Sequence, residues 1–208
     1  KGLVQEPINF TDGSGIRLTV ARFHTPSGRC IQKPYDKDYD YDIYERYEHG
    51  EMTHADSMKV DTTAVFYTMR GRRVYGGGGI IPDIFVPIDT TRATNFYIQC
   101  NRKATQMRFA QTMFDKYRGS LAQIDDFGKL DTYLDQIDLA GQFISYAERV
   151  DGIKLKPGEW EESRTYMMPQ LKALVGRYSK LDDEAFYRFY LPIDETIQIA
   201  LKSSSRVE

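Results

Sequence analysis

The fold of the N-terminal region follows from residues 3–24, which read LVQEPINFTDGSGIRLTVARFH. The middle of this stretch, Thr11–Gly15, is rich in Asp, Gly and Ser, the residues that favour tight turns. After the turn the apolar residues alternate, so that Ile16, Leu18 and Val20 would share one face of a strand. Two extended runs on either side of such a turn predict a β-hairpin.

Two further features extend the β-type region beyond this hairpin. Thr25–Gly28 is a second turn, because Pro26 fixes its own φ and Gly28 tolerates a positive φ. Four consecutive glycines, residues 76–79, then lead into Ile80–Val86, which we predict as a later strand that Pro87 ends. No G-K-[ST] follows the glycines, so backbone turning explains them better than phosphate binding.

The apolar period changes from two to three or four residues after Thr90, which is typical of amphipathic helices. Gly119 and Gly152 are placed to end two of these helices, and Pro169 and Pro192 should mark starts, kinks or breaks in two others. The predicted helices lie near residues 96–117, 139–150, 163–179 and 183–201. The apolar stripe of the first consists of Phe96, Cys100, Ala104, Met107, Ala110, Phe114 and Tyr117, and that of the second of Leu139, Phe143, Ala147 and Val150.

These patterns predict an α+β fold in two parts. Residues 1–90 would hold a partial mixed β-sheet, consisting of the hairpin and the later strand, and residues 91–208 would be mainly α-helical. Residues 35–75 would be an acidic, tyrosine-rich insertion within the first part.

Composition excludes several classes of function. The 208 residues carry 28 Lys and Arg against 30 Asp and Glu, a net charge of −2, and no basic block, which argues against a nucleic-acid partner. Hydrophobic residues make up 41% of the chain, as in an ordinary globular protein. No apolar run approaches the roughly 20 residues of a membrane span, and no motif indicates a cofactor.

The acidic insertion invites a calcium interpretation that its spacing does not support. Four aspartates alternate at Asp36, Asp38, Asp40 and Asp42, but a calcium loop also needs Gly at its sixth position and Glu at its twelfth. Tyr41 and Tyr47 occupy those positions. We therefore predict a solvated acidic loop.

The two cysteines indicate neither a zinc site nor a disulfide framework. Cys30 and Cys100 are far apart in the sequence and lack C-x-x-C spacing, and the three histidines form no ligand pattern with them. We interpret both as small buried thiols.

Four segments carry a resemblance to one family, and they occur in the family's order. These are Lys1–Gln5 (KGLVQ), Asp12–Ser14 (DGS), Leu18–Gln32 (LTVARFHTPSGRCIQ) and Gly79–Ile84 (GIIPDI). Together they resemble the C-terminal processing peptidases, also called tail-specific proteases. The resemblance implies that residues 1–90 form the C-terminal part of the peptidase core. Residues 91–208 look like the long helical C-terminal extension of some members.

The resemblance implies a serine endopeptidase with a Ser/Lys dyad supported by a glutamine. Lys1 matches the lysine that acts as general base, and Gln5 matches the supporting glutamine. A lysine can take the proton of a serine only if burial depresses its pKa towards neutrality. Residues four apart in a strand point to the same face, so the Gln5 amide could orient the amine of Lys1 without raising its pKa as a carboxylate would.

The chain departs from the family pattern at the nucleophile. In the family, the serine, the oxyanion-hole segment and the PDZ domain precede the lysine, and Ser14, Ser27 and Ser57 do not match the serine's position. Cys30 stands where the motif commonly has serine, a change that preserves size. We therefore expect a fragment that begins at the catalytic lysine and is inactive as a peptidase on its own.

The resemblance also sets expectations about partners and location. Substrates would be polypeptides with exposed C-termini, and the family acts in the cell envelope, which favours a periplasmic location. If the sheet lacks the strands that precede residues 3–10, its exposed edge would pair with the missing N-terminal part of the same protein, or with a second copy as a homodimer. The competing hypothesis is a non-enzymatic helical module for interaction or assembly.

Overall fold

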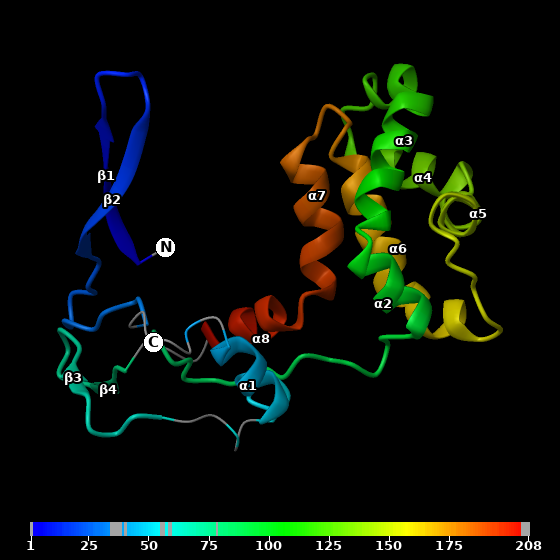
Figure 1. The fold of residues 1–208 in the computed structure, drawn as a ribbon. Helices are drawn as coiled ribbons and strands as arrows, with labels where there is room; N and C mark the ends of the chain where they lie inside the picture. Colours follow the sequence, from blue (N-terminus) through cyan, green and yellow to red (C-terminus); the bar gives the residue numbers. More distant parts are fainter. Residues whose placement is uncertain are drawn as a thin grey trace. The chain divides into compact units, whose positions relative to one another are not determined.

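The computed structural model describes residues 2–33, 39, 41–54, 57, 60–77 and 79–204. It divides the chain into two compact units, residues 1–88 and 89–208, which are described separately below (Figure 1). Within these residues the first unit carries two β-hairpins and one short α-helix, and the second is built of helices. The predicted α+β fold class is confirmed.

The predicted N-terminal hairpin is present. Strands β1 (Leu3–Asn9) and β2 (Gly15–Arg22) pair antiparallel, with Ile8 opposite Ile16. The register shifts between Val4 and Gln5 on β1, so that Val20 on the facing strand has no opposite residue, which is the signature of a β-bulge. The predicted second turn also forms, since the Gly28 N–H donates to the Thr25 carbonyl at 2.8 Å and Gly28 has a φ of +85°.

The predicted later strand is wrong. Residues 80–86 are not in a strand, and the second sheet of the described residues is instead a small antiparallel hairpin of β3 (Val65–Tyr67) and β4 (Arg73–Tyr75). The sheet is therefore not mixed but consists of two separate two-stranded antiparallel sheets. Pro82 lacks an N–H to donate to a neighbouring strand, so the apolar run Ile80–Val86 alone did not justify a strand.

Part of the acidic insertion is helical, where we predicted a solvated loop. Helix α1 covers Asp42–Glu48. The aspartates at positions 36, 38 and 40 lie outside the described residues. Among the residues that are described, no group of His, Cys, Asp and Glu side chains is arranged to hold a metal ion.

The second unit consists of seven α-helices and one short 3₁₀ helix within the described residues. The helices are α2 (Asn95–Arg102), α3 (Thr105–Leu121), α4 (Phe127–Gln136), α5 (Leu139–Asp151), α6 (Glu159–Gly176), α7 (Asp183–Tyr190) and α8 (Glu195–Ser204), with the 3₁₀ helix at Leu191–Ile193. None of the helices in the described part of the chain combines the length and the apolarity that a membrane span needs.

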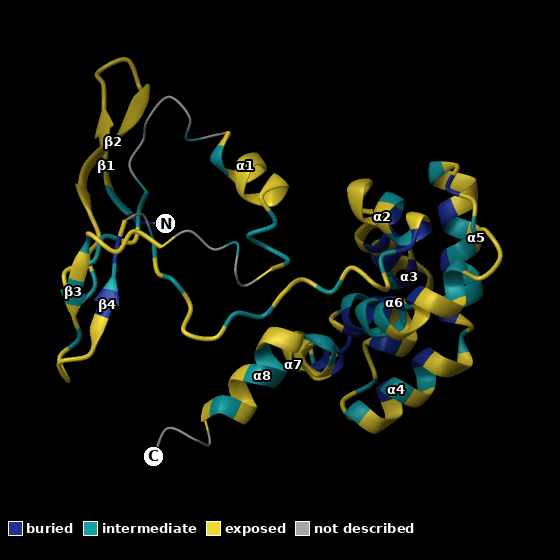
Figure 2. Cartoon of the chain, turned by 90° about the horizontal axis from the view of Figure 1, so that it is seen from below, coloured by how far each residue is buried: buried dark blue, intermediate teal, exposed yellow. Residues whose placement is uncertain are grey.

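The core of the second unit is aromatic at its centre. Phe96, Phe109 and Phe143 are fully buried, and the Phe143 ring meets the other two edge to face at centroid distances of 6.0 and 5.3 Å. Figure 2 shows the buried residues concentrated on the helices of this unit, whereas β1 and β2 are largely exposed. The three-and-four spacing of the apolar residues gave the correct inner face for α2 and for most of α5. For α3 the predicted face is wrong, since Met107 is 60% exposed and the buried Phe109 and Met113 lie outside the predicted stripe.

Four further features of this unit differ from the prediction. The first predicted helix is two helices, because Ala104 adopts a left-handed conformation with a φ of +51° between α2 and α3. Helix α4 was not predicted, Gly119 lies inside α3, which ends at Leu121, and Pro169 lies inside α6. Pro192 breaks the last predicted helix as expected, at the 3₁₀ turn that contains it.

The break between α2 and α3 is tied to the end of α5. The carboxylate of Asp151 accepts a hydrogen bond from Thr105 Oγ1 at 2.6 Å and from Arg108 at 2.7 Å, and its side chain is only 6% exposed. The Thr105 hydrogen bond lowers the pKa of Asp151, burial opposes this, and the charges of Arg108 and Lys103 lower it further, so that the pKa lies below its usual value. This network fixes the chain where Ala104 interrupts the helix.

We expect Asp151→Asn to destabilise the protein by about 2 kcal/mol at pH 7, because it weakens charge-assisted hydrogen bonds. Since the folded-state pKa is depressed, the stabilisation is present above the unfolded pKa near 4 and disappears as the pH falls through the lower folded value. Urea unfolding at pH 7 and pH 3 tests this. The difference between wild type and variant should shrink at pH 3, and Asp115→Asn, at a largely exposed carboxylate, should have little effect at either pH.

Candidate functional site

Gln5 lies in the middle of β1, on the polar face of the hairpin. It is opposite Thr19, and its Nε2 donates a long hydrogen bond of 3.4 Å to Thr19 Oγ1. The apolar pair Ile8 and Ile16 belongs to the other face, because alternate residues of a strand point in opposite directions. The amide of Gln5 is exposed and is held only from the neighbouring strand.

The other predicted site residue, Lys1, lies outside the described residues. Its relation to Gln5 therefore stays a prediction. Gly2, which follows it, is buried, and a Cβ on Gly2 would lie only 2.7 Å from the Cβ of Gln32. The start of the family-like motif thus packs closely against the end of the TPSGRCIQ segment, which needs a glycine at this position.

The serines of the first unit have local roles. Ser14 donates to Asp12 Oδ1 at 2.6 Å in the hairpin turn, and the Ser27 hydroxyl is hydrogen-bonded to Thr25 and to Arg29 Nε. The base that Ser14 contacts is the carboxylate of Asp12, and the hydrogen bonds from Ser14 lower the pKa of that carboxyl below its usual value. These contacts hold the turns together.

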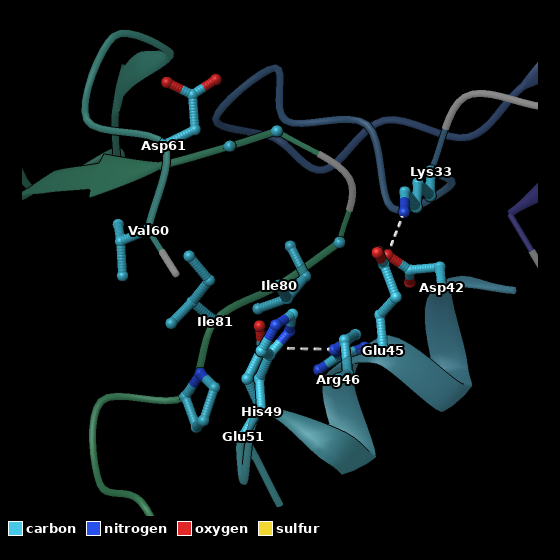
Figure 3. Close-up of a pocket in the computed structure, with 14 residues that line it drawn as sticks. Lys33, Asp42, Glu45, Arg46, His49, Glu51, Val60, Asp61, Ile80 and Ile81 are labelled. Carbon is cyan, nitrogen blue, oxygen red and sulfur yellow. Dashed lines mark hydrogen bonds and ion pairs between the residues drawn. The ribbon is translucent and has the colours of Figure 1, made fainter. Parts of the chain in front are cut away.

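Sequence analysis missed a charged cavity of about 550 Å³ in the first unit (Figure 3). Asp42, Glu45, Arg46 and His49 line it from α1 and the residue after that helix. Their spacing of three, one and three residues places them on one helical face, and this was the signal in the sequence that could have revealed the site. The opposite wall is mostly apolar and glycine-rich, with residues Val60, Gly76, Gly77, Gly79, Ile80, Ile81 and Pro82.

The charges in this cavity are largely paired. Lys33 forms an ion pair with Asp42, and Arg46 Nε donates to Glu51 Oε2 at 2.9 Å. Hydrogen bonds from the side chain and backbone of Thr63 lower the pKa of the Asp61 carboxyl below its usual value. Among the described residues, the lining side chains are charged, imidazole or apolar groups. The arrangement is suited to binding polar groups.

The two cysteines also differ from the prediction in part. Cys100 is fully buried, and burial raises the pKa of its thiol to about 12, so it is unreactive near neutral pH. Cys30 is only half-buried, and its backbone forms an isolated antiparallel β-bridge with His24. Neither forms a disulfide.

Two protein-family models match separate parts of the chain, one within each unit. Residues 1–43, which contain the hairpin and Gln5, match the model of peptidase family S41. This N-terminal stretch is related to the S41 peptidases. Residues 96–179, from α2 into the residues after α6, match a family of unknown function, DUF8443. A search of curated proteins and a search of solved structures found no match.

The S41 relationship bears on Gln5 and leaves the cavity without an assignment. S41 enzymes are serine peptidases by family, so the hairpin carries a peptidase-related motif. Only Lys33 and Asp42 of the cavity fall within the matched residues, whereas the remaining lining residues follow residue 43.

Proposed function

We propose that this chain supplies the Lys/Gln half of the active site of a serine endopeptidase that cleaves polypeptides near their C-termini. The observation that carries the proposal is the S41 match over residues 1–43, which includes the KGLVQ motif, whose last three residues lie on β1. Lys1 is the proposed general base and Gln5 a positioning residue. The nucleophilic serine and a PDZ domain would be supplied by sequence upstream of Lys1, so the 208 residues alone would not cleave peptides.

The proposed reaction has two steps. The neutral amine of Lys1 takes the proton of the serine hydroxyl as the serine oxygen bonds to the scissile carbonyl carbon, and it returns that proton to the leaving amine as the C–N bond breaks. Water then cleaves the acyl-enzyme by the same proton path and restores the serine. Gln5 would orient the amine of Lys1 while leaving its pKa low, since an amide carries no charge.

The exposed hairpin supports a position inside a larger peptidase. Ile8, Ile16 and Leu18 share its apolar face and are 41%, 48% and 50% exposed. An isolated two-stranded hairpin is only marginally stable, and such a face favours a partner that covers it. We propose that the upstream part of the same protein is this partner. A homodimer in gel filtration that Leu18→Glu on the hairpin converts to a monomer would instead mean that a second copy of the chain covers this face.

Location and substrate follow from the same proposal. The protein would act in the cell envelope, in a periplasmic location, on polypeptides whose C-termini are exposed. Among peptides with an apolar C-terminus, cleavage should be faster for a free C-terminal carboxylate than for the matching amide. Equal rates for both would contradict recognition of the C-terminus.

Substitutions of Gln5 test whether this residue positions the amine of Lys1. In the parent protein that includes the upstream sequence, we expect Gln5→Ala to lower kcat/KM about tenfold and Gln5→Glu to move the pH–activity profile to higher pH. The added carboxylate would raise the pKa of the lysine amine and thereby demand a higher pH for its neutral form. Gln123→Ala, at an exposed glutamine of the helical unit, is the matched control. An unshifted profile in Gln5→Glu would remove Gln5 from the site.

A further inference from the structure

A groove of about 450 Å³ runs between α3 and α5. The two helices are antiparallel here, because Thr105 at the start of α3 bonds Asp151 at the end of α5, whereas Lys116 further along α3 reaches Gln142 near the start of α5. The whole groove lies within residues 96–179, the part of the chain that matches the family of unknown function.

The floor of the groove is apolar and its walls are low. Phe109 and Met113 are buried beneath it, and the half-buried Tyr146 packs edge to face on Phe109 at a centroid distance of 5.6 Å. Gly141 and Ser145 form part of the α5 wall, and neither has a side chain large enough to fill the space. The groove is therefore open, and a polypeptide segment could lie along it.

Lys116 and Arg149 in the groove form no ion pair within the part of the chain that the structure describes. Lys116 Nζ donates to Gln142 Oε1 at 2.6 Å and lies 5.0 Å from the centre of the Tyr117 ring, and both of these partners are uncharged. Arg149 is exposed and takes part in no ion pair among the described residues. The one acidic lining residue, Asp138, uses its carboxylate to accept the Gly141 N–H at 3.1 Å and so caps α5.

The residues that line the groove from α5 and its N-cap run from Asp138 to Arg149, which corresponds to roughly 16 Å along the helix. An extended chain covers this distance with about five residues. The two cations lie closer together than this, because Lys116 contacts Gln142, which is seven residues or roughly 10 Å from Arg149 along α5. The hydroxyls of Thr112 and Ser145 lie along the walls, where they can accept hydrogen bonds from the backbone of such a chain.

We propose that the α3–α5 groove binds an extended polypeptide segment of about five residues with an acidic side chain near each end. The carboxylates would pair with Lys116 and Arg149, and an apolar side chain between them would lie over Tyr146. The occupant follows from charge complementarity and from the length of the groove. This function goes beyond the proposed peptidase chemistry and uses neither Lys1 nor Gln5.

The test is fluorescence anisotropy with the full chain and fluorescein-labelled Glu-Ala-Leu-Ala-Glu as the probe. We expect saturable binding that weakens with added salt, and a loss of affinity of about tenfold or more in Lys116→Glu/Arg149→Glu. Ser145→Trp, which fills the groove without changing its charge, should abolish binding. Arg164→Glu, at an exposed arginine of α6, is the control and should bind like wild type. Far-UV circular dichroism of each variant verifies the fold.

Three outcomes would overturn the proposal. The first is equal binding of the Lys-Ala-Leu-Ala-Lys peptide, and the second is unchanged affinity in both groove variants. The third is complete displacement of the acidic probe by millimolar inorganic phosphate, which would indicate a site for simple anions. Because the readout is binding and not cleavage, failure here leaves the proposed peptidase function intact, and the converse also holds.

Discussion

Lys1→Ala in the parent protein is expected to abolish cleavage of a peptide with a free, apolar C-terminus. Loss of a general base lowers kcat/KM by about 10²- to 10⁴-fold, because the serine hydroxyl then keeps its proton at neutral pH. Lys1→Arg should be equally inactive, since a guanidinium keeps the positive charge but does not deprotonate near neutral pH. This pair of variants separates a role as base from a role as a fixed charge.

The control for this prediction is Lys154→Ala, which changes an exposed lysine of the helical unit and should retain full activity. Circular dichroism and the midpoint of thermal unfolding should be unchanged in all three variants. Full activity of the Lys1→Ala protein would remove Lys1 from the mechanism, and full activity of Lys1→Arg alone would assign it a purely electrostatic role.

Phe143→Ala is expected to have the largest effect on stability, with a loss of about 3–5 kcal/mol in the free energy of unfolding. Phe143 is fully buried, and its ring contacts both Phe96 on α2 and Phe109 on α3. Its removal leaves a cavity where three helices meet. Urea unfolding followed by the fluorescence of Trp160, which packs against the same core, measures this loss.

Val150→Ala is the matched control, because it lies on the same helix and belongs to the same predicted apolar stripe. The structure leaves Val150 45% exposed, so its truncation should cost less than about 1 kcal/mol. Similar losses at both positions would mean that the inner face of α5 is assigned incorrectly.

The contrast between these two residues shows what the sequence could predict. The three-and-four spacing placed Leu139, Phe143 and Ala147 on one face of α5, and all three are buried. Gly152 ends this helix as predicted, with a left-handed φ of +68° that favours glycine. Val150 extends the same spacing, but it lies in the last turn of the helix and stays exposed in the described structure.

Other features depend on contacts that local spacing does not reveal. Ala104 has a high helix propensity, so the break between α2 and α3 could not be predicted from it, and tertiary hydrogen bonds to Asp151 hold the new helix start. The run Ile80–Val86 has the composition of a strand but no pairing partner among the described residues. A strand is stabilised by its neighbour, and composition alone does not identify that neighbour.

The turn residues and the alternation of residues 3–24 predicted the hairpin, and the structure confirms it. The KGLVQ motif predicted Gln5 as a site residue; residues 1–43 match the S41 model, and the role of Gln5 stays a prediction. The charged cavity was missed because its lining residues come from α1, from Lys33 and from the glycine-rich segment, which are up to several tens of residues apart. Only the helical spacing of Asp42, Glu45, Arg46 and His49 hinted at it.

The central claim is that this chain carries the base of a Ser/Lys dyad and not its nucleophile. Labelling with a fluorophosphonate, followed by mass-spectrometric mapping of the modified residue, tests it most directly in the parent protein and in the 208-residue chain. We predict one labelled serine upstream of Lys1 in the parent protein, loss of this label in Lys1→Ala, and no label in the 208 residues alone. A label on Ser14, Ser27 or Ser57, or labelling that persists in Lys1→Ala, would contradict the account.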